Sequence, residues 1–512
     1  MNSTPSSRVN NSKRNVSYGI IVTILGTLVS FANRTAFVKC LGVSYLGLNG
    51  LFGEVLAMLS LAELGVGMAI NYSLYKPIHE HDYTRINQLM SLFRKTYNFV
   101  AIFIFGIGLI LLPFVHLFVN GIDFSLSYIR LVFFLFLVST SVSYLFSYNT
   151  SFLNAAQKQY IVSLTSALLN VSFAVFNIIL LVLYHNYVLT LILMIIQTLT
   201  ANIIVTIYVK KKYSFITYND DLSLEDRKKI FIDIKNIFIK KVSGVITSST
   251  TNVLISTLVS TIQVGYYSNY SVLIGVVRTL NRQFASGIKA SIGDLTATET
   301  PERCILVLNR LTFMFFMFSL VISSLLISVI SDFIILWLGE GYVMSKMIVY
   351  VIVLNLFIEI CCEPLWQFLE VSGLFKQDRN IAILGSSINI LIAVWLGQAI
   401  GIVGIFCGTL STQIIQLFLK SKLIYDRMFY SSVWGYWCLW FKLLLTFIIC
   451  VLIQYYLNMH IETQMPIINF VLKALSTFFV SLTILFITFH NSPEYVYCIN
   501  FVKEIVKNRK ND

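Results

Sequence analysis

The chain has 512 residues, of which 57% are hydrophobic and only 12% are charged, about half the charged fraction of an ordinary soluble domain. This composition, with a mean hydropathy of +0.79, excludes a soluble globular protein and predicts an integral membrane protein. The net charge of +13 could suggest a nucleic-acid partner. The basic residues are concentrated in alternate loops, however, as membrane topology requires, so no nucleic-acid partner is expected.

The apolar runs predict an all-α polytopic membrane protein. The first run follows a basic tail (1–16), is too long for a signal-peptide core and lacks a clear cleavage site, so it is expected to remain as a helix. The alternation of Lys and Arg between loops places both termini in the cytoplasm, on the inner side of the plasma membrane. Fourteen spans are predicted, at residues 17–38, 44–74, 98–119, 125–149, 160–183, 187–209, 242–262, 265–292, 311–335, 346–372, 380–398, 400–419, 437–457 and 465–489.

Two polar segments divide the chain. The longer one, 210–241, contains a capping box of Ser223 and Asp226 and isoleucines at helical spacing, which predicts a short amphipathic helix on the inner membrane surface. The other, YDRMFYSSVWGYW (425–437), separates the last two spans from the rest. The predicted organisation is therefore a tail, two six-helix lobes joined by a linker, an accessory pair and a second tail (1–16, 17–209, 210–241, 242–424, 425–489 and 490–512).

The two lobes resemble each other in sequence. LGVSYLGLNGLFGEV (41–55) aligns at an offset of 221 residues with IQVGYYSNYSVLIGV (262–276), and FLNAAQKQ (152–159) resembles FLEVSGLFKQ (368–377) once two residues are inserted. The two matches occur in the same order. An even number of spans in each unit makes this a parallel repeat, with a pseudo-twofold axis along the membrane normal.

The eighth span carries charge that lipid would not tolerate. Within VGYYSNYSVLIGVVRTLNRQFASGIKASIGD (264–294), the side chains of Arg278, Arg282 and Lys289 fall within about 40° of one another on a helix. A cation at the centre of a bilayer costs about 3 kcal/mol by insertion scales. This basic face is therefore expected to meet water, a counter-charge or an anionic ligand.

The tenth span carries the matching carboxylates. Glu359, Glu363 and Glu370 are spaced four and seven residues apart, as the cations are, and they lie at the same depths when counted from the outer ends. Two interpretations stay open: a ladder of salt bridges between adjacent helices, or two walls of one cavity in which the cations bind an anion and Glu359 or Glu363 binds a coupling proton or metal ion. Pro364 is expected to kink this helix.

The first lobe offers two further candidates. Arg34 lies about a membrane thickness from the basic tail, so its guanidinium either reaches the outer interface or points into a lumen. Glu54 sits near mid-depth in the second span and is a candidate for a cavity wall.

No catalytic set can be assembled from the sequence. The eight cysteines form no C-x-x-C pair, the adjacent Cys361 and Cys362 indicate packing, and the six histidines are scattered near loops and helix ends. We therefore expect no enzyme, no metal centre and no organic cofactor.

The chain resembles the Wzx-type polysaccharide flippases of the multidrug/oligosaccharidyl-lipid/polysaccharide (MOP) exporter superfamily. The resemblance rests on NRTAFVKCLGVSYLGLNGLFGEVLAMLSLAELGVGMAINYSLYKPI (33–78), on QVGYYSNYSVL (263–273), on QKQ (157–159) and FKQ (375–377), and on the fourteen spans. It implies two six-helix lobes around a central cavity, with the last helix pair beside them.

The function that the resemblance implies is translocation of an undecaprenyl-diphosphate-linked oligosaccharide to the outer leaflet of a bacterial cell membrane, for capsule, exopolysaccharide or O-antigen synthesis. It also implies alternating access, H⁺ or Na⁺ as the coupling ion, and contact with membrane lipids, a polymerase and other assembly proteins. By helix and charge, Arg34, Arg278 and Arg282 correspond to the arginines that related flippases use for the diphosphate. The alternatives are a cation-coupled multidrug antiporter of the same fold and a membrane glycan polymerase, which the short predicted outer loops disfavour.

Overall fold

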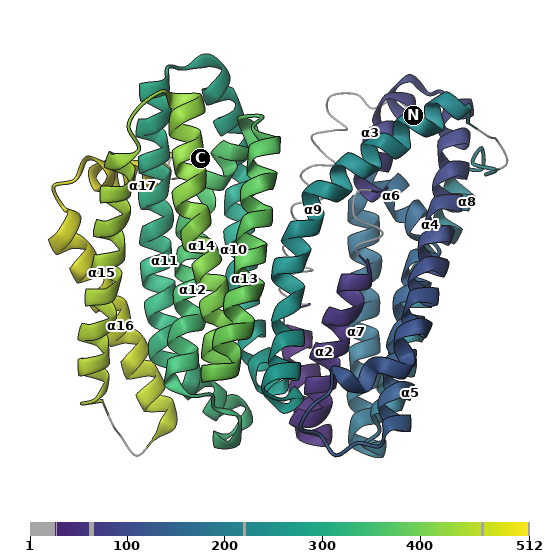
Figure 1. Cartoon of the computed structure of the whole chain (residues 1–512), viewed down its shortest axis with the longest axis horizontal. Helices are drawn as coiled ribbons and strands as arrows, with labels where there is room; N and C mark the ends of the chain where they lie inside the picture. Colours follow the sequence, from purple (N-terminus) through teal and green to yellow (C-terminus); the bar gives the residue numbers. More distant parts are fainter. Residues whose placement is uncertain (1–25, 27, 61–65, 219–221, 462–464, 510–512) are drawn as a thin grey trace. The chain divides into compact units, whose positions relative to one another are not determined.

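The structure is a computed structural model that describes residues 26, 28–60, 66–218, 222–461 and 465–509. All regular structure in these residues is helical (Figure 1), and ten helices are long and apolar enough to cross a membrane. The predicted class, an all-α polytopic membrane protein, is therefore confirmed. The chain forms two compact units, Met1–Gly265 and Tyr266–Asp512. The six-helix repeat and its lobe boundaries stay predictions.

Unit 1 is a bundle of helices, and the bounds of some of these helices differ from those of the predicted spans. The single span expected at 44–74 is two helices, because α2 ends at Leu59 and α3 begins at Val66. The described helices of this unit are residues 28–41, α2 (Val43–Leu59), α3 (Val66–Glu80), α4 (Tyr83–Leu111), the 3-10 turn η2 (Leu112–Leu117), α5 (Leu126–Tyr144), α6 (Ser147–Ala155), α7 (Gln159–Tyr184), α8 (Tyr187–Lys212) and α9 (Leu224–Leu258).

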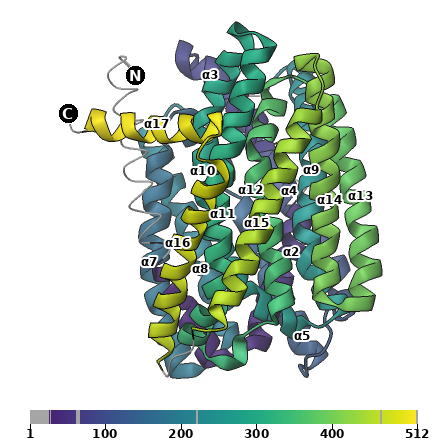
Figure 2. The same ribbon diagram turned by 90° about the vertical axis from the view of Figure 1, so that its left-hand side faces the viewer.

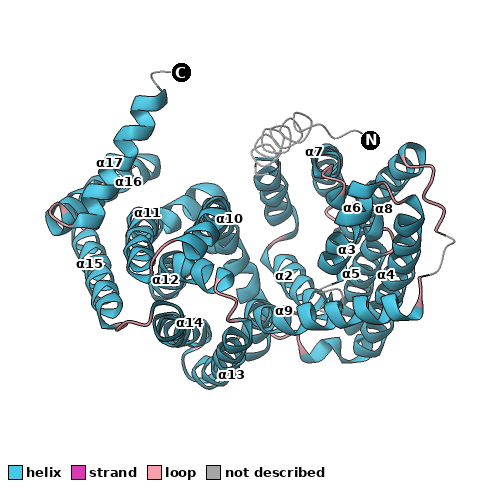
Figure 3. Ribbon diagram, turned by 90° about the horizontal axis from the view of Figure 1, so that it is seen from above, coloured by secondary structure: helices cyan, strands magenta, loops and turns pink. Residues whose placement is uncertain are grey.

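The helix α9 joins the predicted linker helix to the predicted seventh span. It runs without a break through residue 241, where the sequence predicted a boundary, and it curves so that its first part crosses the end of unit 1 (Figure 1, Figure 3). Ile230 is buried and Ile234 packs beside it in a core shared with Leu89 and Phe93 of α4. Protein therefore covers this part of the amphipathic face, which the sequence had assigned to the membrane surface.

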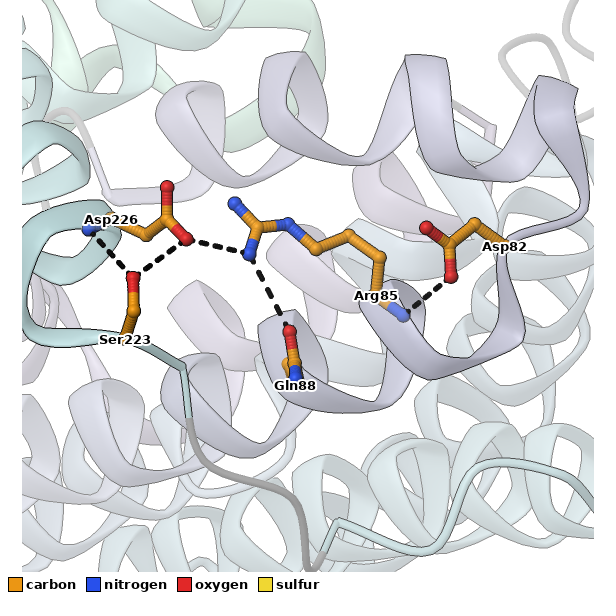
Figure 4. A network of polar contacts seen from close by, with 5 residues as sticks. All are labelled: Asp82, Arg85, Gln88, Ser223 and Asp226. Atoms are coloured by element: carbon orange, nitrogen blue, oxygen red, sulfur yellow. Dashed lines mark hydrogen bonds and ion pairs between the residues drawn. The ribbon is translucent and has the colours of Figure 1, made fainter.

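A polar network fastens the start of α9 to α4 (Figure 4). The hydroxyl of Ser223 accepts a hydrogen bond from the amide of Asp226 at 3.2 Å and donates one to its carboxylate at 2.8 Å, so Ser223 caps α9 as the sequence predicted. The carboxylate of Asp226 accepts a hydrogen bond from Nη1 of Arg85 at 2.8 Å. Next to it, the side chain of Asn87 donates to the carbonyl of Phe215 at 2.7 Å and accepts from the amide of Thr217 at 2.8 Å. The linker is thus held by side chains of α4.

Unit 2 holds the remaining helices. The segment 490–512, predicted as a tail, contains a helix, α17, which runs across the end of α16 (Figure 2). The helices are α10 (Thr261–Thr298, which begins in unit 1), α11 (Pro301–Leu338), η3 (Glu340–Tyr342), α12 (Lys346–Val371), α13 (Phe375–Ile400), α14 (Ile402–Ile424), the π-helical turn η4 (Tyr425–Phe429), α15 (Trp434–Asn458), α16 (Pro466–Phe489) and α17 (Pro493–Arg509).

The core of unit 2 is built around α12. Phe357 of this helix stacks on Phe447 of α15, with ring centroids 4.0 Å apart. Cys361 and Cys362 are fully buried in the same cluster, so the prediction that they are packing residues is confirmed. On the other side, α13 and α14 approach so closely that a Cβ added to Gly408 would lie 2.8 Å from the carbonyl oxygen of Asn389. A central, largely buried α12 fixes the positions of its carboxylates.

Candidate functional site

The strongest polar contact between α10 and α12 joins Arg278 and Glu359. Nε of Arg278 lies 3.1 Å from Oε1 and 2.9 Å from Oε2 of Glu359, and Nη2 lies 2.9 Å from Oε2. Such forked contacts fix both side chains and are stronger than neutral hydrogen bonds. The side chains remain 37% and 27% exposed, so a small ligand could still reach the pair.

A second pair lies further along the same two helices. Nζ of Lys289 contacts Oε2 of Glu370, and both side chains are largely exposed. Each pair joins residues 81 positions apart in sequence. The sequence left open whether these charges pair or line a cavity, and the structure shows that two of the three possible pairs are formed.

The third pair that the spacing would allow, between Arg282 and Glu363, is not formed in the described chain. Glu363 is half-buried and accepts a hydrogen bond from Nε2 of Gln367, one turn along α12, at 2.7 Å. Arg282 is exposed and takes part in no ion pair within the part of the chain that the structure describes. We call the two formed pairs, Arg278–Glu359 and Lys289–Glu370, the closed rungs of the ladder. The unformed pair, Arg282 and Glu363, is its open rung, and the side chain of Arg282 is exposed. Pro364 lies inside α12, which stays helical to Val371.

The other two candidates belong to unit 1. Arg34 is half-buried in the helix at 28–41, next to Asn33, whose side-chain oxygen accepts a 2.8 Å hydrogen bond from Asn177 of α7. Glu54 is half-buried on α2. Unit 1 has a cavity of about 350 Å³ lined by α2, α5 and α8, and its lining includes Gly53 but not Glu54. The structure thus leaves the roles of Arg34 and Glu54 as predictions.

One buried ion pair was missed by the sequence analysis. Lys420 of α14 is only 9% exposed. Its Nζ lies 3.0 Å from Oδ1 of Asp378 and 5.6 Å from the ring centroid of Trp366. Both charged residues lie just outside the ends of predicted spans, and no regular spacing in the sequence links them. They stabilise the end of unit 2 at which α13 begins and α14 ends.

Comparisons with known proteins show what this architecture resembles. No family model and no curated protein matches the sequence. Among solved structures, the lipid II flippase MurJ in an inward closed conformation aligns with a TM-score of 0.69 and 16% identity, over 93% of this chain and 99% of that one.

Multidrug transporters share the same architecture. A multidrug resistance MATE family transporter of the MOP superfamily aligns with a TM-score of 0.62 and 14% identity, over 78% of this chain and 95% of that one. A Vibrio cholerae MATE transporter, VcmN, aligns with a TM-score of 0.55 and 16% identity, over 83% and 100%. At these identities the likeness shows the fold, which is the one common to MurJ and the MATE transporters.

Proposed function

We propose that this chain, which has the fold of the MOP-superfamily flippases and transporters, translocates an undecaprenyl-diphosphate-linked oligosaccharide from the inner to the outer leaflet of a bacterial cell membrane. The likeness to a lipid II flippase over 93% of the chain supports a lipid-linked substrate. The sequence resemblance to Wzx-type flippases supports an oligosaccharide destined for capsule, exopolysaccharide or O-antigen.

The observation that carries the proposal is the open rung of the ladder. A diphosphate headgroup needs a positive partner, and Arg282 is an exposed guanidinium on α10, within the predicted span 265–292, with no ion pair in the described chain. A guanidinium forms forked hydrogen bonds with phosphate oxygens. Arg282 is thus the first contact we assign to the diphosphate, with Arg278 one turn away on the same helix.

The closed rung suggests how transport could be coupled to an ion. Glu359 forms an ion pair with the guanidinium of Arg278, so a bound diphosphate would compete with this carboxylate for the same guanidinium. Protonation of Glu359, or binding of Na⁺ to Glu359 and Glu363, would remove the competitor and release Arg278 to the substrate. Transport that is unaffected by collapsing both the proton and the sodium gradients would argue against this coupling.

The test is export in cells that depend on this protein. Arg282→Ala and Arg278→Ala are each expected to lower surface polymer at least about tenfold, the effect of losing roughly 1.4 kcal/mol of binding, while lipid-linked repeat units accumulate on the inner leaflet. The matched control is Lys376→Ala, which removes an exposed cation from α13. Export at the wild-type level in both arginine variants, with normal amounts of protein in the membrane, would overturn the assignment.

A multidrug antiporter is the second candidate. The MATE transporters share the fold over most of the chain. The three carboxylates of the ladder equal its three cations in number, so the ladder has no net positive charge that would repel a cationic substrate. Reconstituted protein separates the two functions: a flippase moves a diphosphate-linked glycolipid between leaflets, whereas an antiporter accumulates a cationic dye against an ion gradient.

A further inference from the structure

Unit 2 contains a cavity with charged lining residues, at the opposite end of α12 from Glu370. Its volume is about 290 Å³, and it is lined by the ends of α11 and α15 and the beginnings of α12 and α16. The predicted topology places this end of the helices on the outer side of the membrane. None of the residues of the ladder lines it.

The charges of this cavity favour an anion. Lys346 and Lys473 line it, opposed by Asp332 alone. Nζ of Lys473 lies 2.8 Å from Oδ2 of Asp332, and both side chains are about four-fifths buried, at 18% and 21% exposure. Lys346 is exposed, forms no ion pair among the described residues, and stands in the first turn of α12. The amides at a helix N-terminus carry partial positive charge, so they add to the lysine.

The polar groups of the cavity favour a ligand that also carries hydroxyls. Asn458 lines the cavity, and its Oδ1 accepts no hydrogen bond in the described chain, so rotation of this amide would offer the ligand an acceptor that is not already in use. The side chains of Tyr350 and Tyr455 line the same cavity. A phosphate with an attached polyol would supply both the negative charge and the hydroxyl donor.

The surroundings favour a lipid as the source of this group. Met459, which lines the cavity just after α15, is exposed, and the end of α15 and the beginning of α16 expose further large apolar side chains, namely Leu452, Tyr456 and Ile467. In a membrane, acyl chains would cover these side chains while a headgroup reached the lysines. We propose that this cavity binds the phosphate of an anionic, hydroxyl-bearing phospholipid headgroup, such as phosphatidylglycerol, in the outer leaflet. The proposal does not rest on the transported substrate.

The test measures lipid binding to the purified full-length chain in a non-ionic detergent. Phosphatidylglycerol is expected to bind and to raise the melting temperature more than phosphatidylcholine does. Lys346→Gln is expected to weaken phosphatidylglycerol binding about fivefold, since one lysine near an anionic lipid contributes about 1 kcal/mol. Lys346 is chosen because its removal leaves the Lys473–Asp332 pair intact. The control is Lys39→Gln, an exposed lysine in unit 1.

Two further arms define the ligand. Asn458→Ala is expected to weaken phosphatidylglycerol but not phosphatidic acid, whose headgroup has no glycerol hydroxyl. Soluble glycerophosphoglycerol that binds with the same dependence on Lys346 would show that the phosphate is recognised without acyl chains, whereas binding of the lipid alone would identify the membrane as the source. Equal binding of phosphatidylglycerol and phosphatidylcholine, or equal effects of Lys346→Gln and Lys39→Gln, would overturn the proposal.

Discussion

The guanidinium of Arg278 contacts both carboxylate oxygens of Glu359, at 3.1 and 2.9 Å from Nε, and so ties α10 to α12 across 81 residues of sequence. The next potential pair, Arg282 and Glu363, has the same separation in sequence but no ion pair. The contribution of the Arg278–Glu359 contact to stability can therefore be measured, with Arg282 and Glu363 on the same two helices as the reference pair.

The first prediction is that Arg278 and Glu359 are energetically coupled. In a double-mutant cycle with alanine at each position, the double variant should be more stable than the sum of the single effects predicts, by roughly 1 kcal/mol, because each single variant leaves one charge without its partner. The measurement is unfolding in detergent. The same cycle at Arg282 and Glu363, which interact through their charges but form no ion pair, should show weaker coupling, and equal coupling in the two cycles would contradict the observed geometry.

The second prediction concerns the contact of α13 with α14. Gly408→Ala would place a Cβ 2.8 Å from Cβ of Ala393 and from the carbonyl oxygen of Asn389, so it should destabilise unit 2 by about 1–3 kcal/mol. Gly275→Ala is the control, because nothing lies within 4 Å of the added Cβ, and it should be neutral or slightly stabilising. Melting temperatures of the two variants in detergent test this difference, and similar values would count against close packing at Gly408.

The third prediction ranks the contacts that hold the linker. Asn87→Ala removes two hydrogen bonds to the backbone of the linker, whereas Arg85→Ala removes one partly exposed ion pair, and such pairs are usually worth less than about 1 kcal/mol. Amide hydrogen exchange across 213–223 should therefore increase more in Asn87→Ala than in Arg85→Ala. Lys76→Ala, which breaks a more exposed ion pair with Glu80, should leave this exchange unchanged. The reverse order for the first two variants would show that the ion pair dominates.

The fourth prediction is a dependence of stability on pH. Lys158, in the turn between α6 and α7, has its pKa lowered to about 8 by burial, with a further contribution from the charge of Lys212. The unfolded chain holds this proton up to the ordinary lysine pKa of about 10.5. It therefore binds more protons than the folded chain between pH 8 and the ordinary lysine pKa, so stability should rise with pH in that window.

Melting temperatures of the wild type and Lys158→Gln test this dependence. The wild type should gain stability relative to the variant as the pH rises above about 8, and the difference should be nearly constant below it. Lys76→Gln, which removes a mostly exposed charge, controls for the general effect of losing one lysine. A difference between wild type and Lys158→Gln that does not change with pH would contradict the lowered pKa.

The sequence indicated that the two closed rungs were possible, because helical periodicity aligns charges with equal spacing on two helices, but it left open whether the charges pair or line a cavity. It did not predict that Glu363 pairs with Gln367, although a carboxylate and an amide four residues apart lie on the same helical face. The buried Lys420–Asp378 pair depends on how α13 and α14 pack, and no sequence periodicity carries that information.

The predicted membrane class agrees with the structure, because long apolar runs leave few alternatives. Fourteen spans were predicted and ten helices of the described residues are long and apolar enough to cross a membrane; α9 and α10, which hold the seventh and eighth predicted spans, are not among the ten. The exceptions have a common cause: a helix can begin or end at a residue where the hydrophobic composition of the sequence does not change. The apolar pattern continues past the end of α2 at Leu59. In α9, one continuous helix contains both the polar linker segment and the predicted seventh span, so the change of composition near residue 241 is not a helix boundary. The helix α17 is too polar to be found by hydropathy.

The matched charges of α10 and α12 also bear on how the protein is made. Translation at about 5–20 residues per second puts roughly 4 to 16 seconds between the synthesis of Arg278 and that of Glu359, 81 residues later. During that interval α10 carries three cations without the carboxylates that balance them, and a bare cation in lipid is costly. Release of α10 from the insertion machinery into lipid is therefore expected to be favoured only after α12 has emerged, which would let the two helices enter the bilayer with their charges balanced.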